Sequence, residues 1–308
     1  MHEANPDAGS AASNDSHASK SARTRLGRVG IWSMELRFGD SAQAAEAAAE
    51  LDELGFGAIW IPGGVGGDVF GDVDRLLSAT RRAVIATGII NIWKHKAEDI
   101  GAWWKAQSAE RQARLLLGLG VSHGPLIGDA YRSPLATMRT YLAQLSEQGL
   151  PPKALCLAAL GPKMLELSRD RTAGAHPYLV TPEHSAMARR ILGPDALLAP
   201  EQGVVLERDP ARARELCVHA LEHYRRLPNY LNSWRRLGFA EDDITNASGR
   251  LIDALFAYGG TERIVERVNA HLSAGADHVC LQVITGAAGA DVAAARRAWR
   301  ELASALIS

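Results

Sequence analysis

Eight short apolar segments recur along this chain, and each is followed by a segment with the composition of a helix. The apolar segments cover residues 29–32, 58–61, 83–90, 115–119, 154–160, 174–179, 203–206 and 278–283. Each is a nearly continuous hydrophobic run, which is typical of parallel strands that are covered by helices on both faces. Eight strand–helix units in about 280 residues predict an α/β fold closed into a (β/α)8 barrel, the TIM barrel.

The segments between the strands carry the start and stop signals of helices. The alanine-rich residues 41–54 are followed by Gly55, and Thr181 with Pro182 makes an N-cap and a first helical residue. Further helices are expected at 72–80, 97–107, 134–148 and 291–307, and one begins at Pro162. Between residues 210 and 274 no clear strand is visible, so residues 210–256 are interpreted as a helical insertion near the seventh strand.

An open, doubly wound sheet is the alternative arrangement for strands and helices in this order. Such a sheet usually carries a glycine-rich dinucleotide fingerprint after its first strand. The corresponding segment here, "GIWSMELRFGD", has no such pattern. The barrel is therefore the favoured prediction.

Composition argues against several classes of protein. The 308 residues are 47% hydrophobic and 22% charged, which suits one large globular domain or two small ones. A net charge of −1 gives no basic field for nucleic acid, and no apolar run reaches the roughly 18 residues of a membrane helix. Three scattered cysteines do not make a disulfide framework or a zinc site. We therefore expect a cytoplasmic protein with no nucleic-acid or membrane partner, its cysteines buried in the core.

Residues 1–25 differ from the rest of the chain. They are rich in Ala, Ser, Asn and Asp, and they lack the apolar core of a secretory signal. Such a segment buries too little surface to order itself. We expect a disordered leader at 1–25, followed by one barrel domain at 26–308.

The C-terminal ends of the strands carry the candidate site residues, because the site of a (β/α)8 barrel lies at that face. The fourth strand lies in "RLLLGLGVSHGP" and ends on Val121, Ser122 and His123. Two interpretations stay open, a turn with a solvated histidine or a functional site. In "HALEH", His219 and His223 are four residues apart but lack the glutamate of an HExxH site, so we expect a solvated helix face and no metal.

Five segments together resemble the luciferase-like flavin and deazaflavin oxidoreductases. They are "VIATGIINIW", "RLLLGLGVSHGP", "YRSPLATMRTYL", "LAALGPKMLELS" and "GAHPYLVTPEH". The resemblance is greatest to the branch that depends on coenzyme F420, and it runs from about residue 26 to residue 283. It implies a barrel with an insertion and an enzyme that transfers a hydride between F420 and a small organic substrate.

In that family a bulge after the third strand, often with a non-proline cis peptide, lies under the central cofactor ring. The matching residues here are Gly88 and Ile89. The family holds the cofactor phosphate at the start of the fifth helix, where N–H groups attract an anion, and the matching residues are Leu160, Gly161 and Pro162. Each feature also has a plain structural interpretation, a glycine for close packing and a Gly-Pro helix start.

By the same resemblance, a set of strand-end residues would surround the cofactor. These residues are Trp32, Gly88, Ile89, Ile90, Asn91, Val121, Ser122, His123, Leu160, Gly161 and Pro162. His176 and Tyr178 would reach the substrate, and His123 and His176 are the catalytic candidates.

The chain departs from the family pattern at two strand ends. Pro62 and Gly63 stand where several deazaflavin members carry an Asp-His pair, and His123 stands where a sugar-phosphate dehydrogenase of the family has a catalytic glutamate. A histidine, with an unperturbed pKa near 6.5, could act there as the proton donor. The glycine-dense residues 63–72 are expected to form a mobile loop at the mouth of the site.

Two other functions remain open at this point. One is an FMN-dependent luciferase-like monooxygenase, because both cofactor rings use the same bulge and phosphate site. The other is a barrel that binds a flavin or a small ligand without turnover. Family members commonly form dimers, so a homodimer is expected, with the alanine-rich helix at 41–54 at its interface.

Overall fold

The computed structural model describes residues 25–64 and 66–307, so the predicted leader lies almost wholly outside the described residues. Within them, ten parallel strands form one curved sheet. The strands are β1 (Val29–Trp32), β2 (Ala58–Gly63), β3 (Val84–Asn91), β4 (Leu115–Gly120), β5 (Leu155–Leu157), β6 (Gly174–Ala175), β7 (Leu197–Leu198), β8 (Glu201–Val205), β9 (Phe256–Tyr258) and β10 (Val279–Val283). Almost every strand residue is buried, as expected for strands covered on both faces.

Two short strands together close the sheet into a barrel. The strand order is β7-β6-β5-β4-β3-β2-β1-β10-β8-β9, so β7 and β8 lie near its opposite ends. Yet β7 and β8 are separated along the chain by Ala199 and Pro200 alone. The first pairs with β6 and the second with β10, so together they act as one barrel strand. With β9 as an extra edge strand, the predicted (β/α)8 barrel is confirmed.

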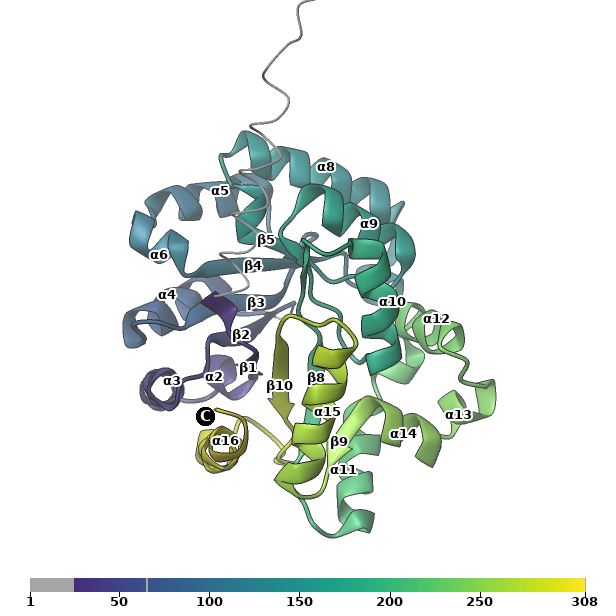
Figure 1. Ribbon diagram of the computed structural model, residues 1–308. Coiled ribbons are helices and arrows are strands. Elements are labelled where there is room, and N and C mark those ends of the chain that lie inside the picture. The colour runs from purple at the N-terminus through teal and green to yellow at the C-terminus, as the bar shows by residue number, and fades with distance from the viewer. Residues whose placement is uncertain (1–24, 65, 308) are drawn as a thin grey trace, which may run out of the picture.

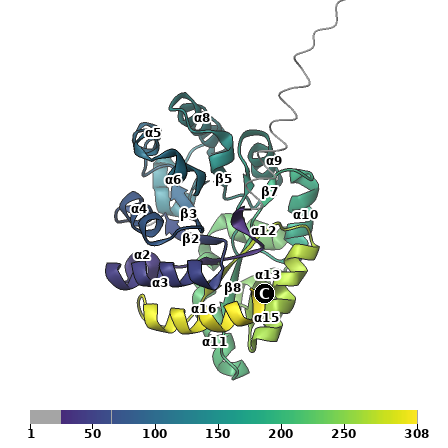
Figure 2. The ribbon, with the colours of Figure 1, turned by 60° about the vertical axis from the view of Figure 1, so that its left-hand side comes forward.

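Helices surround the strands, as Figure 1 shows. They are α2 (Glu35–Phe38), α3 (Ser41–Leu54), α4 (Val69–Ala79), α5 (Ala97–Ala106), α6 (Ala109–Ala113), α7 (Gly124–Ile127), α8 (Pro134–Glu147), α9 (Pro162–Arg171), α10 (Pro182–Leu192), α11 (Pro210–Leu221), α12 (Pro228–Arg236), α13 (Glu241–Thr245), α14 (Gly249–Leu255), α15 (Thr261–Ser273) and α16 (Val292–Leu306). Three single 3₁₀ turns are η1 (Gly128–Ala130), η2 (Pro152–Ala154) and η3 (Tyr224–Arg226). In Figure 2, α3 and α16 lie side by side, and Arg296 of α16 pairs with Glu50 of α3. Among the described helices, none combines the length and the apolar character that crossing a bilayer requires.

Most predicted helix boundaries agree with the structure. The helix at 41–54 ends at Gly55 with φ +94°, and the Thr181 side chain accepts a hydrogen bond from the backbone N–H of His184 as the predicted N-cap. The helix expected at 72–80 begins earlier, at Val69, because the Asp68 carboxylate caps the N–H of Gly71.

Three strand predictions were wrong in extent, each because of proline or the cavity. The fifth strand is shorter than the predicted 154–160, because residues 158–161 line a cavity. The sixth strand is shorter than the predicted 174–179, because Pro177 has no N–H to donate to the neighbouring strand. The seventh strand was predicted at 203–206, and the structure instead has β7 and β8, one on each side of Pro200. The prediction of no strand between 210 and 274 was also wrong, since β9 pairs with β8.

Three hydrophobic cores hold the molecule together. The largest lies between the sheet and its helices, and a second fills the barrel. The third lies among α11, α12 and α14, and it fixes these helices against the barrel. Inside the barrel, the Trp60 indole N–H donates to His278 Nε2 over 3.1 Å, which anchors the floor of the cavity described next. All three cysteines are buried and free, as predicted.

Candidate functional site

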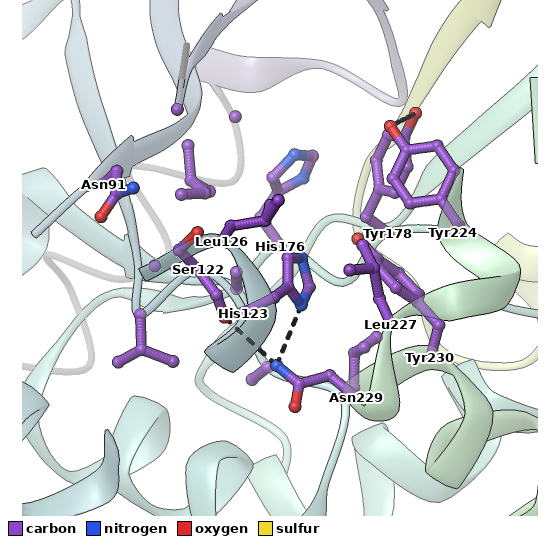
Figure 3. A pocket seen from close by; sticks show the side chains of 18 of the residues that line it. Asn91, Ser122, His123, Leu126, His176, Tyr178, Tyr224, Leu227, Asn229 and Tyr230 are labelled. Atoms are coloured by element: carbon purple, nitrogen blue, oxygen red, sulfur yellow. Dashed lines mark hydrogen bonds between the residues drawn. The ribbon is translucent and has the colours of Figure 1, made fainter. Parts of the chain in front are cut away.

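A cavity of about 510 Å³ opens at the C-terminal ends of the strands. Its size lies within the range of small-molecule and cofactor sites. Residues of β1, β3 and β4 line it, together with residues that directly follow β5 and β6 and residues of η3 and α12. Figure 3 shows the cavity from close by. Its lining includes Trp32, Gly88, Ile89, Asn91, Gly120, Val121, Ser122, His123, Leu160, Gly161, His176, Tyr178, His223, Tyr224, Leu227, Asn229, Tyr230, Asn232 and Arg236.

The floor of the cavity contains a bulge in β3. Pairing with β4 moves from Ala86 opposite Leu116 to Ile90 opposite Leu119, so β3 holds one extra residue. The glycines of "LGLG" make room for it, since a Cβ on Gly120 would lie 2.5 Å from Ile89 Cδ1. The peptide bond between Gly88 and Ile89 is cis, where the family resemblance places it.

Gly88 forms a tight cradle between two aromatic side chains. A Cβ at this position would lie 2.5 Å from Trp32 Nε1 and 2.6 Å from His176 Nε2. The Trp32 indole N–H also donates to the Gly88 carbonyl over 3.1 Å. Without a side chain, the backbone of Gly88 is open to the cavity, so a flat ring can approach it closely.

His176 presents a bare nitrogen at this cradle. Its Nδ1 lies 2.8 Å from the Ala199 carbonyl oxygen, which only accepts, so Nδ1 carries the proton. Its Nε2 is buried and has no partner within residues 25–64 and 66–307. Its ring stacks on Trp60 with centroids 4.2 Å apart, and burial lowers its pKa to about 4. His176 is therefore an uncharged hydrogen-bond acceptor at neutral pH.

His123 follows β4, and Figure 3 shows its ring facing Asn229. The chain turns there through Ser122, whose φ of +57° is unusual for a residue with a Cβ. Burial, together with the neighbouring His223, lowers the pKa of His123 to about 4. His123 is thus uncharged at neutral pH. Its expected role as the proton donor stays a prediction.

Three tyrosines form an aromatic wall beside His123. Tyr178 follows β6, whereas Tyr224 and Tyr230 come from η3 and α12. Their ring centroids lie 5.1–6.3 Å apart, and Tyr230 continues the contact to His123 at 5.3 Å. Burial raises the pKa of each phenol, so this wall is uncharged.

A buried glutamate behind the wall fixes the turn that carries Tyr178. Leu179 has a φ of +53°, and its N–H donates to Glu201 Oε2 over 3.1 Å. The Trp234 indole N–H donates to the Leu179 carbonyl, so α12 holds the same turn from the other side. Burial raises the pKa of Glu201 to about 8, and its Oε1 has no partner among the described residues.

The far end of the cavity lies at the start of α9. Gly161 is the N-cap, and no side chain caps this helix. Arg236 of α12 reaches the same place, where its guanidinium donates to the Leu160 carbonyl over 3.1 Å. First-turn N–H groups and a guanidinium together favour an anion. Among the described residues that line the cavity, Arg236 is the one Lys, Arg, Asp or Glu side chain.

The glycine-rich loop after β2 lies at the mouth of the cavity. It is shorter than predicted, because β2 continues to Gly63 and α4 begins at Val69. Buried Arg37 donates to the carbonyl oxygens of Pro62 and Gly66 and pairs with Asp72 of α4. The loop is therefore tied to α2 and α4, and its predicted mobility stays a prediction.

Most of the predicted site residues lie together at the cavity. Ile90 and Pro162 do not line it. Ile90 is fully buried in the core behind the sheet, because neighbouring strand residues point to opposite faces. Pro162 is the first residue of α9 and lies beside the cavity lining. We expected His219 and His223 to share one solvated helix face, and this was wrong. His223 lies beyond the end of α11 and lines the cavity.

Sequence reasoning missed the residues that the insertion contributes. They are His223, Tyr224, Leu227, Asn229, Tyr230, Asn232 and Arg236. The segment "HYRRLPNYLNSWRR" is dense in Tyr, Asn and Arg around a proline, and this composition is the signal that marks it. Within the described part of the chain, no three His, Cys, Asp or Glu side chains gather in a way that would hold a metal ion.

The sequence matches no protein-family model and no curated protein sequence. Solved structures do share its fold. An F420-dependent secondary alcohol dehydrogenase in complex with an F420-acetone adduct has a TM-score of 0.66 at 13% identity, over 92% of this chain and 99% of that one. The coenzyme F420-dependent tetrahydromethanopterin reductase from Methanopyrus kandleri has a TM-score of 0.61 at 13% identity, over 89% and 98%.

An FMN-binding protein shares the fold to a similar degree. It is the oxygenating constituent of 3,6-diketocamphane monooxygenase from Pseudomonas putida, in complex with FMN. Its TM-score is 0.63 at 12% identity, over 90% of this chain and 96% of that one. These likenesses show the fold that the resemblance to luciferase-like oxidoreductases predicts.

Proposed function

We propose that this protein is an oxidoreductase that binds coenzyme F420 in the cavity and exchanges a hydride with a small, uncharged organic substrate. The observation that carries the proposal is the Gly88 cradle in the β3 bulge, open to the cavity between Trp32 and His176. The sequence resemblance places the central ring of a flavin or deazaflavin at this bulge. The F420-dependent enzymes that share the fold add support.

The residues present fit such a cofactor at both of its ends. At the ring end, the buried Nε2 of His176 has a lone pair without a partner among the described residues, and Gly88 lines the cavity with backbone atoms alone. At the tail end, the start of α9 and Arg236 favour a phosphate. A bound deazaflavin would supply the hydride, and the chain would supply position, electrostatics and the exclusion of water.

The side chains around the ring end have complementary tasks. Trp32, Ile89 and Asn91 would lie on one side of the ring, and Val121, Ser122 and His123 on the other. The tyrosine wall beside Tyr178 would enclose the substrate in an uncharged pocket. His123 and His176 would contact the reacting groups through hydrogen bonds, because neither ring is positively charged at neutral pH.

FMN-dependent monooxygenation is the second candidate function. It is favoured by the FMN complex that shares the fold with a TM-score close to those of the F420-dependent enzymes. We place F420 first because the sequence segments resemble the deazaflavin branch. We also infer one barrel domain at 26–308 with its insertion at 210–256, a homodimer and a cytoplasmic location.

Equilibrium titration tests the choice of cofactor. Purified protein is titrated with F420 and, separately, with FMN, and binding is followed by fluorescence quenching. We expect saturable binding of both at one site, with F420 the tighter ligand. A clear preference for FMN would move the assignment to the monooxygenase, and no binding of either would refute the proposal.

A further inference from the structure

We propose that Asn229 of the insertion is a positioning residue that holds His123 as an N–H donor, so that the site accepts a substrate through a carbonyl oxygen. This inference rests on the proposed function, because it assigns the substrate side of the same cavity. It rests on three steps, the orientation of the Asn229 amide, the resulting tautomer of His123 and the charge of the surrounding wall.

The orientation of the Asn229 amide follows from its two contacts. Its Nδ2 lies 3.2 Å from the Ser122 carbonyl oxygen and 3.2 Å from His123 Nδ1 (Figure 3). A backbone carbonyl only accepts hydrogen bonds, so the atom facing it must be the amide nitrogen. That NH2 group has two protons and supplies one to each contact. Nδ1 of His123 is therefore an acceptor.

The tautomer of His123 follows from that contact. A neutral imidazole carries its proton on one nitrogen, and an acceptor at Nδ1 leaves it on Nε2. The His123 ring makes no other hydrogen bond within the described residues, and it lines the cavity beside Tyr230. The Nε2–H is therefore free to donate to a ligand. His176 has the opposite arrangement, with a bare Nε2.

The charge of the surrounding wall selects the kind of acceptor. His123, His176 and the tyrosine wall are all uncharged at neutral pH, and Arg236 lies at the other end of the cavity beside Leu160. A carboxylate or phosphate at the tyrosine wall would lose its hydration with no lysine or arginine of the described cavity lining beside it, which is costly. An uncharged carbonyl oxygen needs one donor, and His123 offers one. The aromatic wall also suits a substrate with a large apolar part.

Replacing the donor by an acceptor reverses the predicted hydrogen bond. In Asn229→Asp, the carboxylate accepts a proton from Nδ1, so Nε2 loses its hydrogen. Asn229 is the second residue of α12, where an acidic side chain favours the helix, so this variant should fold. Asn232→Asp is the matched control. It adds the same charge on the same helix, and it also lines the cavity, but among the described residues the Asn232 side chain accepts a hydrogen bond from Arg235 and makes none to His123.

Nitrogen NMR on the full chain reads the tautomer directly. In 15N-histidine-labelled protein, we expect His123 with a protonated Nε2 in the wild type and in Asn232→Asp, and with a protonated Nδ1 in Asn229→Asp. A neutral His123 that keeps its one proton on Nε2 in Asn229→Asp would overturn the positioning role. The measurement needs neither cofactor nor turnover. A failure of the cofactor titration would refute the proposed function and would leave this result unaffected.

Two simple probes test the direction of the hydrogen bond to the ligand. Acetophenone offers an acceptor alone, whereas 1-phenylethanol, its alcohol, both accepts and donates. We expect Asn229→Asp to weaken acetophenone binding about tenfold, the value of one hydrogen bond, and to leave 1-phenylethanol within about twofold. Equal losses for both probes in Asn229→Asp, or no loss for either, would overturn the assignment of a carbonyl oxygen.

Discussion

Substituting Gly88 by alanine tests whether the β3 bulge is a cofactor cradle. The added methyl carbon would lie 2.5 Å from Trp32 Nε1 and 2.6 Å from His176 Nε2, whereas ordinary contacts begin near 3.4 Å. One ring or both must therefore move by about 1 Å. Neither ring is free to do so. Trp32 and His176 are 5% and 1% exposed, and His176 is held by Trp60 and by the Ala199 carbonyl.

The structure sets the expected size of the effect. Overpacking a closed core of this kind costs about 1–3 kcal/mol of unfolding free energy. Trp32 and His176 both line the cavity, so displacing their rings should disturb its ring end and raise the F420 dissociation constant at least about tenfold, a loss of about 1.4 kcal/mol.

Urea unfolding and F420 fluorescence quenching measure the two effects of Gly88→Ala. Gly66→Ala is the matched control, because a Cβ there meets nothing within 4 Å and Gly66 does not line the cavity. The control should match the wild type in both assays. If Gly88→Ala were as stable as the control and bound F420 equally well, the cradle would have no part in binding and the reasoning would fail.

Three further predictions follow from the structure. Burial raises the pKa of Glu201 from 4.5 to about 8. Between these pH values the folded state binds one more proton than the unfolded state, so the unfolding free energy falls as the pH rises, by up to about 1.4 kcal/mol per pH unit. Glu201→Gln should remove this slope in urea unfolding between pH 5 and pH 8, and parallel profiles would contradict it. Arg236→Gln should weaken F420 binding about fivefold, the value of one exposed charge contact. Arg235→Gln removes a guanidinium that pairs with Glu241, and it should leave the F420 dissociation constant unchanged in the same titration. Sedimentation at micromolar concentration should show a homodimer, and a monomer alone would exclude it.

The sequence predicts the barrel well where burial is uniform. The first four strands agree with their apolar runs, because helices cover both faces and no polar alternation interrupts them. The later strands were predicted too long or in the wrong place. Pro177 and Pro200 interrupt the hydrogen bonds between strands within apolar segments. A pattern of hydrophobic residues gives no sign of a missing backbone N–H, so it does not predict these interruptions.

The site could be predicted in part, for a related reason. The end of β4 near His123 could be located because barrel topology brings strand ends together. The bulge at Gly88 could be located because this segment resembles the luciferase-like oxidoreductases. Ile90 was placed at the cavity, although an extra residue in β3 turns it into the core. The contribution of Asn229 and Tyr230 could not be predicted. It depends on how the insertion packs over the barrel, and no local pattern encodes that packing.

A crystal structure of the protein with saturating F420 tests the central claim most directly. The account predicts density for the tricyclic ring against Gly88 and Ile89, and for the phosphate at the start of α9 beside Gly161 and Arg236. Density for F420 at any other place, or an empty cavity in crystals grown at saturating F420, would contradict it.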